Sequence, residues 1–436
     1  MLVPVLSARQ RGPDGRVMLA SHSPEDRLGE AVGLAEAIDL DVVARLLVPV
    51  SAPRPSTLFG SGKVDELKTL VAETETQLVI VDHAITPVQQ RNLEKALLAK
   101  VLDRTGLILE IFGRRARTRE GRLQVELAHL TYQKGRLVRA WTHLERQRGG
   151  GGFLGGPGEA QIELDRRMLE GRIEAIKKEL VEVVKTRELH RAGRRKVPYP
   201  VVAIVGYTNA GKSTLFNRLT GAGVLAKDQV FATLDPTMRE VKLASGRRII
   251  LSDTVGFISD LPTMLVAAFR ATLEEVIEAD LILHVRDISH PETEAQARDV
   301  EQVLTDLGID TVPAHRHILE VWNKIDLLSA VTHEEALAAA RFDERAPVPV
   351  SALSGEGLAD LLDRIDARLG TSDALVTVAV PTHDGRLIAW LYENTDVVSR
   401  ATNEDESRII FTVRIAAERM GRLTAQLKRH GLDAHS

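Results

Sequence analysis

Eight residues near the middle of the chain have the types and spacing of a phosphate-binding loop. Residues 206–213 read GYTNAGKS, which fits the pattern G-x-x-x-x-G-K-[ST]. An apolar run at residues 201–205 precedes them, and Leu215, Phe216 and Leu219 follow at helical spacing. In such a loop the backbone N–H groups and the helix N-terminus point at the anion. We therefore expect a nucleotide to bind between this strand and this helix.

Two side chains of the loop are expected to bind the phosphates and the metal ion, in addition to the backbone N–H groups. Lys212 is expected to neutralise charge on the β- and γ-phosphates, and the Ser213 hydroxyl is expected to ligate Mg²⁺ directly. A glycine-rich turn without a ligand is the alternative, and the flanking strand and helix disfavour it. The predicted phosphate-binding residues are Gly206, Tyr207, Thr208, Asn209, Ala210, Gly211, Lys212 and Ser213.

A second motif follows the apolar residues 249–251 and reads Asp253-Thr254-Val255-Gly256. The Asp253 carboxylate is expected to hold Mg²⁺ through its water shell, and the Gly256 N–H to sense the γ-phosphate. The pattern D-x-x-G is common on its own. It becomes specific here because it follows a phosphate loop in the expected order.

A third motif, Asn323-Lys324-Ile325-Asp326, follows an apolar run at residues 318–322. The Asp326 carboxylate can accept hydrogen bonds from both the N1–H and the N2 amino group of guanine. Adenine has no such pair of donors and would leave the carboxylate unpaired, so the discrimination is steep. Asn323 is expected to brace the neighbouring loops, and the Lys324 stem to cover the base. A solvated turn is the alternative.

Two further segments complete an ordered set. Ser351-Ala352-Leu353 follows residues 348–350, where a backbone N–H can reach guanine O6. Between the phosphate loop and Asp253, the residues 231–237 read FATLDPT. A GTPase needs a threonine here that ligates Mg²⁺ and contacts the γ-phosphate. Thr233 and Thr237 both meet that requirement.

Phe257 stands where many GTPases carry the glutamine that orients the attacking water. Phenylalanine cannot hydrogen-bond that water, which predicts slow intrinsic hydrolysis. Either Phe257 only packs in the interior and another residue of the chain positions the water, or a bound partner completes the catalytic site.

The elements that must position these residues define four expected domains. Residues 197–370 alternate strands and helices and are expected to form a doubly wound sheet with the ligand at the carboxyl ends of its strands. Residues 1–113 show the same alternation and predict an α/β domain with a parallel sheet, in which residues 107–112 are expected to be a strand. Residues 371–436 predict a small α+β module.

Residues 114–196 predict an antiparallel helical hairpin, because leucine and other apolar residues recur at spacings of three and four. Each helix is expected to be about 35 Å long at 1.5 Å per residue. The seam residues are Leu123, Leu127, Leu130, Leu137, Trp141 and Leu144 on the first helix and Leu169, Ile173, Ile176, Leu180 and Val183 on the second. The glycine-rich tip at residues 149–158 is longer than a turn requires. It is either a flexible linker or a surface that fits against a crowded polyanion.

Charge and composition narrow the class of protein. The 436-residue chain has a net charge of −4, yet residues 111–196 carry 21 Lys and Arg against 11 Asp and Glu, a net charge of +10. Such asymmetry favours a polyanionic partner. The absence of cysteine excludes disulfides and thiolate chemistry and suits a reducing cytoplasm. No stretch has the length and apolar character of a bilayer span or a signal peptide. The 13 histidines show no metal-ligand spacing.

A second short motif, Gly60-Ser61-Gly62-Lys63, looks like the end of a phosphate loop. It lacks a glycine at Thr57 and a hydroxyl residue at position 64, and no apolar strand feeds it directly. We interpret it as a turn that starts the next helix, with a second nucleotide site as a weaker alternative.

The whole set of motifs resembles the HflX family of translation-factor-class GTPases, and the resemblance covers most of the chain. The glycine tip departs from the family's usual pattern at residues 151–156 and at Ala160. The residues that carry the resemblance are GYTNAGKS (206–213), FATLDPT (231–237), DTVGFI (253–258), NKID (323–326), SAL (351–353), the GPGE that ends the glycine tip (156–159) and LFGSGKV (58–64).

By that resemblance Thr233 is the threonine that ligates Mg²⁺ directly, so that Lys212, Thr233 and Gly256 form the catalytic set. The resemblance also implies a partner, the 50S ribosomal subunit with its ribosomal RNA, and a glycine tip that points towards the peptidyl-transferase region. It implies a monomer off the ribosome that dissociates stalled or idle ribosomes under stress. The resemblance also adds the segment around Thr233 to the predicted GTP-binding residues. That segment is Phe231, Ala232, Thr233, Leu234 and Asp235.

Other functions remain as alternatives at this stage. The chain could be a GTPase that assists assembly of the large subunit, or a nucleotide-gated RNA-binding regulator whose hydrolysis is incidental. The N-terminal domain could also carry an ATP site and remodel RNA. We expect the protein in the cytoplasm, with peripheral membrane association as an alternative.

Overall fold

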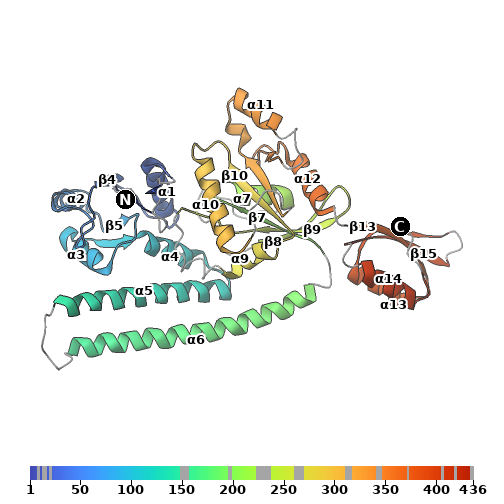
Figure 1. Ribbon diagram of the computed structural model, residues 1–436, viewed down its shortest axis with the longest axis horizontal. Coiled ribbons are helices and arrows are strands. Elements are labelled where there is room, and N and C mark those ends of the chain that lie inside the picture. Colours follow the sequence, from blue (N-terminus) through green and yellow to red (C-terminus); the bar gives the residue numbers. More distant parts are fainter. Residues whose placement is uncertain are drawn as a thin grey trace. The chain divides into compact units, whose positions relative to one another are not determined.

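The computed structural model divides into two compact units, built mainly from residues 1–183 and 184–436, and each is described separately (Figure 1). The structure describes residues 1–6, 10–11, 17–18, 22–147, 157–194, 199–221, 237–259, 270–309, 317–339, 346–370, 373–403, 407–416 and 420–432.

The first unit begins with a four-stranded sheet in which every pair of neighbouring strands is parallel, in the order β4-β1-β5-β6. This confirms the parallel sheet that the alternating pattern predicts. Ser23 caps α1 by accepting a 3.1 Å hydrogen bond from Asp26 N–H, as expected for a serine before a proline. The strands and helices are β1 Leu2–Leu6, α1 Pro24–Glu36, β4 Leu46–Val50, α2 Ser61–Glu73, β5 Leu78–Val81, α3 Pro87–Leu97, β6 Lys100–Asp103 and α4 Arg104–Arg115; a short pair, β2 Gln10–Arg11 and β3 Val17–Met18, stands apart from this sheet.

The prediction of a strand at residues 107–112 is wrong, because these residues lie inside helix α4. Asp103 ends β6 and caps the helix at once by accepting a 2.8 Å hydrogen bond from Gly106 N–H. Leu107, Ile108 and Ile111 are almost completely buried. A short run with one polar residue, Glu110, defines no period that separates a buried strand from a buried helix, and the cap decides the outcome here.

The predicted hairpin is present as two helices, α5 Arg119–Gln147 and α6 Pro157–Arg194, which lie side by side in Figure 1. They are longer than predicted, about 44 Å and 57 Å at 1.5 Å per residue. Ion pairs between described side chains join them, including Arg119 to Glu179 at 3.6 Å, Lys134 to Glu170 at 2.9 Å and Arg172 to Glu126 at 2.8 Å. Of the predicted seam residues with described side chains, Leu123, Ile173 and Ile176 are buried and the rest are partly buried. Residues 149–156 of the glycine tip lie outside the described residues.

The first hairpin helix is fixed to the sheet by the carboxylate of Asp103. Its Oδ1 accepts a 2.6 Å hydrogen bond from the Tyr132 hydroxyl, and its Oδ2 accepts one of 2.8 Å from Arg136. Arg136 also donates to the Gln90 side chain. Burial, with Asp103 as a further cause, raises the pKa of Tyr132. Because Asp103 is only 3% exposed, the hairpin and the N-terminal sheet share a buried polar contact at this point.

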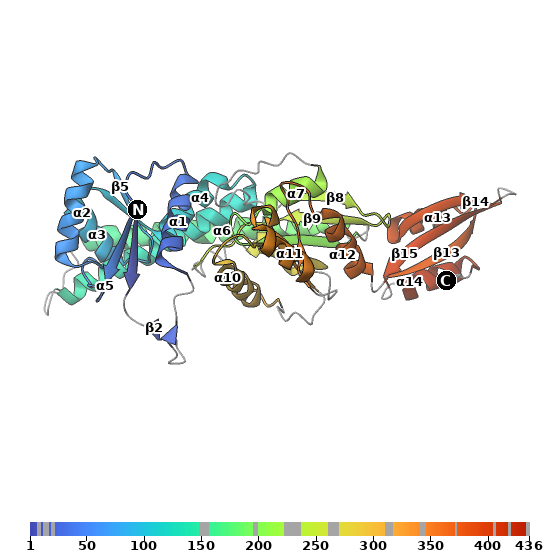
Figure 2. The same cartoon turned by 90° about the horizontal axis from the view of Figure 1, so that it is seen from above.

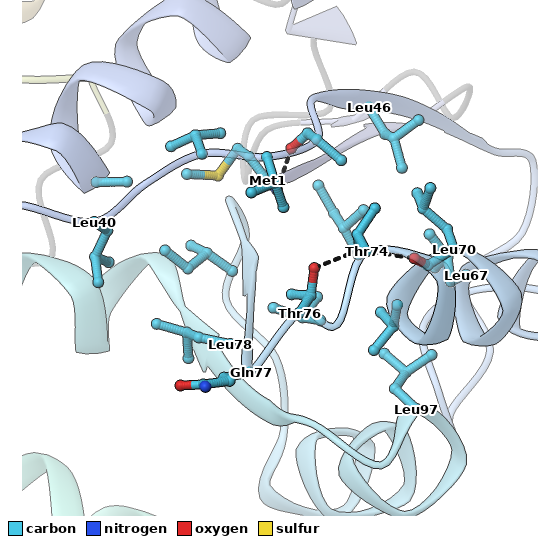
Figure 3. Close-up of a pocket in the computed structure, with 18 of the residues that line it drawn as sticks. Met1, Leu40, Leu46, Leu67, Leu70, Thr74, Thr76, Gln77, Leu78 and Leu97 are labelled. Atoms are coloured by element: carbon cyan, nitrogen blue, oxygen red, sulfur yellow. Dashed lines mark hydrogen bonds between the residues drawn. The ribbon is translucent and has the colours of Figure 1, made fainter.

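The N-terminal domain contains a cavity of about 420 Å³ (Figure 3). Its wall is mostly apolar and includes Met1, Leu46, Leu70 and Leu78, with Thr74 and Thr76 hydrogen-bonded to each other beside it. The cavity meets α2 in its second half, whereas the predicted turn at residues 60–63 forms the start of α2. The turn therefore starts a helix, as we interpreted it, and the cavity does not include it.

The second unit contains a six-stranded sheet in the order β12-β11-β10-β7-β9-β8, parallel except for the edge strand β8. Alternate residues of the central strands, such as Ile204, Leu283 and Val321, pack with α7 and α12 in one core. Helix α10 lies across the sheet from α7 (Figure 2). Helix α9 precedes strand β10 in the chain. The elements are β7 Val201–Gly206, α7 Lys212–Thr220, β8 Thr237–Lys242, β9 Arg248–Asp253, α9 Arg270–Ile277, β10 Leu281–Asp287, α10 Thr293–Asp306, β11 Ile318–Asn323, a 3₁₀ turn Ile325–Leu327, α11 Ala330–Ala339, β12 Val348–Pro349 and α12 Leu358–Gly370.

The C-terminal part is an antiparallel sheet in the order β13-β15-β14, with helices α13 and α14 on one face (Figure 1). Ala416 ends strand β15, and the described part of the last helix, α14, begins at Met420. Strand β14 escaped prediction because most of its residues are exposed and it carries polar side chains. The elements are β13 Asp373–Pro381, α13 Gly385–Asn394, β14 Asp396–Thr402, β15 Arg408–Ala416 and α14 Met420–Arg429. Among the described residues of the whole chain, no helix is both long and apolar enough to cross a membrane.

Candidate nucleotide-binding site

The predicted phosphate loop connects β7 to α7, at the edge of the sheet where the parallel strands end. Gly206 and Gly211 are the two positions where the backbone admits no side chain. A β-carbon at Gly206 would lie 2.2 Å from the Val285 carbonyl oxygen, and one at Gly211 would lie 2.2 Å from Nδ2 of Asn323. Gly211 also has a φ of +90°, which disfavours other residues. The two glycines therefore let the loop lie close to its neighbouring strands.

Lys212 begins helix α7 and is buried. Its Nζ donates a 2.6 Å hydrogen bond to the carbonyl of Tyr207, so the ammonium group lies inside the loop. Burial lowers the pKa of Lys212 to about 8, and the nearby carboxylate of Asp253 opposes that shift. A buried cation surrounded by a phosphate loop is poised to gain free energy when an anion arrives.

Ser213 and Asp253 meet at the start of α7. The Ser213 hydroxyl donates a 2.8 Å hydrogen bond to Oδ2 of Asp253, whose residue has no exposed surface. A hydroxyl and a carboxylate are oxygen donors of the type that Mg²⁺ prefers. The pair therefore fits a magnesium ion held by Ser213 directly and by Asp253 through water, as the sequence predicts.

The segment after Asp253 pairs with the phosphate loop through its backbone. Phe257 N–H donates to the Gly206 carbonyl at 3.1 Å, and Thr208 N–H donates to the Phe257 carbonyl at 2.7 Å. The Tyr207 hydroxyl accepts a 2.8 Å hydrogen bond from Ser259 N–H. A β-carbon at Gly256 would lie 3.0 Å from Lys212 Nζ, so Gly256 passes beside the ammonium group.

Phe257 is only 1% exposed, and its side chain is part of the protein interior. The structure shows that the ring packs, which agrees with both interpretations of this position. A buried phenyl ring cannot contact a water molecule that attacks a phosphate, so the residues described here leave water positioning to another group.

Asn323 connects the phosphate loop to the predicted base-binding loop. Its Nδ2 donates a 2.7 Å hydrogen bond to the Ala210 carbonyl, and its Oδ1 accepts one of 3.0 Å from Ala352 N–H. The side chain is 1% exposed. Asn323 thus braces the two loops in the way its position in the motif predicts.

The other residues predicted to bind the base follow Asn323 in the same turn or lie in the neighbouring loop after β12. Asp326 is exposed in the 3₁₀ turn that follows β11, where a carboxylate can meet a ligand. Ser351 is buried and its hydroxyl accepts a hydrogen bond from Ser354 N–H at 3.0 Å. Leu353 is 75% exposed. Arg218 of α7 was not singled out in the sequence, yet it donates at 3.1 Å to the Ser354 carbonyl and ties the same loop to the phosphate helix.

One segment of the predicted site, between the phosphate loop and β8, is not among the described residues. Phe231, Ala232, Thr233, Leu234 and Asp235 lie outside the described residues. The first described residue after them is Thr237, which begins strand β8. The role of Thr233 in holding Mg²⁺ therefore stays a prediction.

Family models match four consecutive stretches of the chain. Residues 25–113 match the N-terminal region and residues 115–194 the middle region of GTP-binding GTPases. Residues 201–324 match a model described as a 50S ribosome-binding GTPase, and residues 336–432 match the HflX C-terminal domain.

Curated relatives match almost the full length of the chain. The GTPase HflX of Magnetococcus marinus is 50% identical over 431 residues, which cover 97% of each chain. The GTPase HflX of Escherichia coli is 45% identical over 377 residues, 86% of each chain. A solved GTP-binding protein from Sulfolobus solfataricus in complex with GDP aligns with a TM-score of 0.43 at 24% identity, over 85% of this chain and 99% of that one. The chain belongs to the HflX family of GTPases.

Proposed function

We propose that this protein is a Mg²⁺-dependent GTPase that binds the large ribosomal subunit and separates stalled or idle ribosomes under stress. The observation that carries the enzymatic part is the convergence of Lys212, the Ser213–Asp253 pair and Asn323 at one edge of the sheet. The match of residues 201–324 to a 50S ribosome-binding GTPase supports the ribosomal partner.

Each residue has a distinct task in this proposal. Lys212 neutralises charge on the β- and γ-phosphates, and the Gly256 N–H donates to the γ-phosphate. Asp326 accepts the guanine donors, and a backbone N–H at Ala352 or Leu353 meets O6. A magnesium ion held by Ser213, Thr233 and the water shell of Asp253 would further neutralise the phosphates.

The buried position of Phe257 supports a switch rather than a fast enzyme. With that side chain in the interior, intrinsic hydrolysis is slow, and the ribosome supplies or orders the group that positions water. GTP then marks the bound state and GDP the released one. The net charge of +10 on residues 111–196 supports contact with ribosomal RNA through the hairpin.

The choice of guanine is tested by Asp326→Asn. The variant should bind GTP roughly 10- to 100-fold more weakly, because one paired acceptor is replaced by a mismatched amide. It should gain affinity for xanthosine triphosphate, whose base presents an oxygen where guanine has an amino group. Asp306→Asn, on the exposed surface of α10, is the charge-matched control and should leave both affinities unchanged. Unaltered GTP affinity in Asp326→Asn would refute this role of Asp326.

The ribosomal part is tested by the GTPase rate in a titration with purified 50S subunits, with 30S subunits as the control. Stimulation by 50S alone supports the proposal, and a flat rate contradicts it. Sedimentation profiles of depleted cells separate splitting from assembly. Accumulation of precursor subunits would favour an assembly factor, whereas excess intact 70S ribosomes under stress would favour splitting.

A further inference from the structure

Lys324 has a well-defined partner in the structure. It follows Asn323 with a left-handed backbone, φ +67°, which turns the chain at the end of β11. Its Nζ lies 2.7 Å from Oδ2 of Asp287 in an ion pair. The side chain of Lys324 is 30% exposed and that of Asp287 is 12% exposed. The lysine stem is therefore held at both ends, by the turn and by the carboxylate.

Asp287 is itself fixed by the neighbouring strand and turn. It is the last residue of β10 and lies opposite Asn323 in the parallel ladder. Its Oδ1 accepts hydrogen bonds from Ser289 N–H at 3.1 Å and from the Ser289 hydroxyl at 2.6 Å. Ile288 N–H donates to the Asn323 carbonyl at 3.1 Å. One carboxylate oxygen thus anchors the residue to its own turn, while the other is directed to Lys324.

We propose that Asp287 is a positioning residue for the guanine base, acting through Lys324. This inference rests on the proposed GTP site. A lysine side chain has many rotamers, and part of that rotamer entropy is lost when its stem is ordered against a ligand. Asp287 restrains the stem before the nucleotide arrives, so less ordering remains for binding.

The ion pair is partly exposed, and a pair of this kind contributes little to folding stability. Lys324 lies between Asn323, which braces the phosphate loop, and Asp326, the predicted acceptor for guanine. The same carboxylate also sits at the carboxyl end of a parallel strand, as Asp253 and Asn323 do.

The test compares nucleotide affinities of full-length variants. Asp287→Asn keeps the shape of the side chain and an acceptor for Ser289 but removes the charge that holds Lys324. The Kd values for GDP and GTP should rise by the same factor, about 3- to 10-fold, because the base is common to both. In steady-state turnover the KM for GTP should rise, and kcat should stay the same. Asp287→Glu keeps the charge and should lose less affinity, and Asp306→Asn is the control for loss of a surface charge.

A double-mutant cycle separates positioning from a structural role. Lys324→Met removes the ammonium group and keeps an apolar stem. If Asp287 acts through Lys324, then Asp287→Asn should have no further effect on Kd in the Lys324→Met background. Additive losses, or an Asp287→Asn variant that binds like wild type, would overturn the inference. Wild-type protein that binds no guanine nucleotide would instead overturn the proposed function itself.

Should Asp287→Asn unfold, Lys324→Met and Asp287→Glu still decide the matter. Both should weaken GDP and GTP equally, with Asp287→Glu closer to wild type. Wild-type affinity in Lys324→Met would contradict the inference, because a stem without an ammonium group cannot be held by Asp287.

Discussion

The side chain of Asn323 donates a 2.7 Å hydrogen bond to the carbonyl of Ala210, a residue 113 positions earlier in the chain. The contact joins the end of β11 to the phosphate loop, while the other end of the same amide holds Ala352. The predicted base-binding and phosphate-binding halves of the site are therefore linked by one buried side chain.

Asn323→Ala should weaken GDP and GTP binding together. It leaves the Ala210 carbonyl and the Ala352 N–H without their buried partner, at about 1–3 kcal/mol for each unsatisfied group. We expect Kd for both nucleotides to rise roughly 10- to 100-fold, and the melting temperature to fall by several degrees. Fluorescence titration and thermal unfolding measure these changes. A variant that discriminates between GDP and GTP would contradict the link between the two halves.

Ser213→Ala should remove the Mg²⁺ dependence of GTP binding. Its hydroxyl and the Asp253 carboxylate form the oxygen pair at the start of α7. In excess Mg²⁺ the variant should bind GTP about 10- to 100-fold more weakly than wild type, and in a chelator the two should bind alike. A loss of equal size with and without Mg²⁺ would show that the hydroxyl has another task.

Lys212 should make nucleotide affinity depend on pH. In the free protein burial lowers its pKa from 10.5 to about 8. Below about pH 8 the amine is already charged, so the affinity for the nucleotide should not change with pH. Above that pH the phosphates must draw a proton onto Lys212, so affinity should fall with rising pH, by up to about tenfold per unit. Calorimetry in buffers of different ionisation enthalpy measures that proton uptake.

The same shift affects the stability of the nucleotide-free protein in the opposite direction. Between about pH 8 and the ordinary pKa of 10.5, the unfolded chain binds a proton at Lys212 that the folded chain has lost. The Lys212 contribution to the free energy of unfolding therefore rises with pH in that window.

Lys212→Arg, whose guanidinium stays charged, is the control for the binding experiment and should show no proton uptake when the nucleotide binds. Uptake that persists in this variant would assign the titration to another group.

Phe257→Gln should not create a fast GTPase. The wild-type ring is buried, so the amide would enter an apolar interior instead of facing the phosphates. The free energy of unfolding should fall by about 3–5 kcal/mol, and the single-turnover rate should not rise. Val331→Gln, at a position that is 67% exposed, is the matched control and should leave stability almost unchanged. Faster hydrolysis in Phe257→Gln would contradict the account of this residue.

Much of the nucleotide site could be predicted because its motifs follow parallel strands. The carboxyl ends of β7, β9 and β11 meet at one edge, so Ser213, Asp253 and Asn323 come together once the strand order is known. Asp287 and Arg218 carry no motif of their own. Their contacts depend on the register of β10 with β11 and on the packing of α7, which a single sequence does not display.

The remaining errors have similar physical causes. Residues 107–112 are apolar except for Glu110 and are too few to define a period, and the hydrogen bond from Gly106 N–H to Asp103 starts a helix there. Tyr132 and Arg136 look like ordinary surface residues of a hairpin, yet both hydrogen-bond to Asp103. Only the tertiary structure brings that carboxylate and that helix together.

The central claim is that GTP switches the affinity of this protein for the large ribosomal subunit. Co-sedimentation with separated 50S and 30S subunits, in the presence of a non-hydrolysable GTP analogue or GDP, tests it most directly. We predict that the protein pellets with 50S subunits in the GTP analogue, is released in GDP, and does not pellet with 30S subunits. Equal binding to both subunits, or binding to 50S that is indifferent to the nucleotide, would contradict the claim.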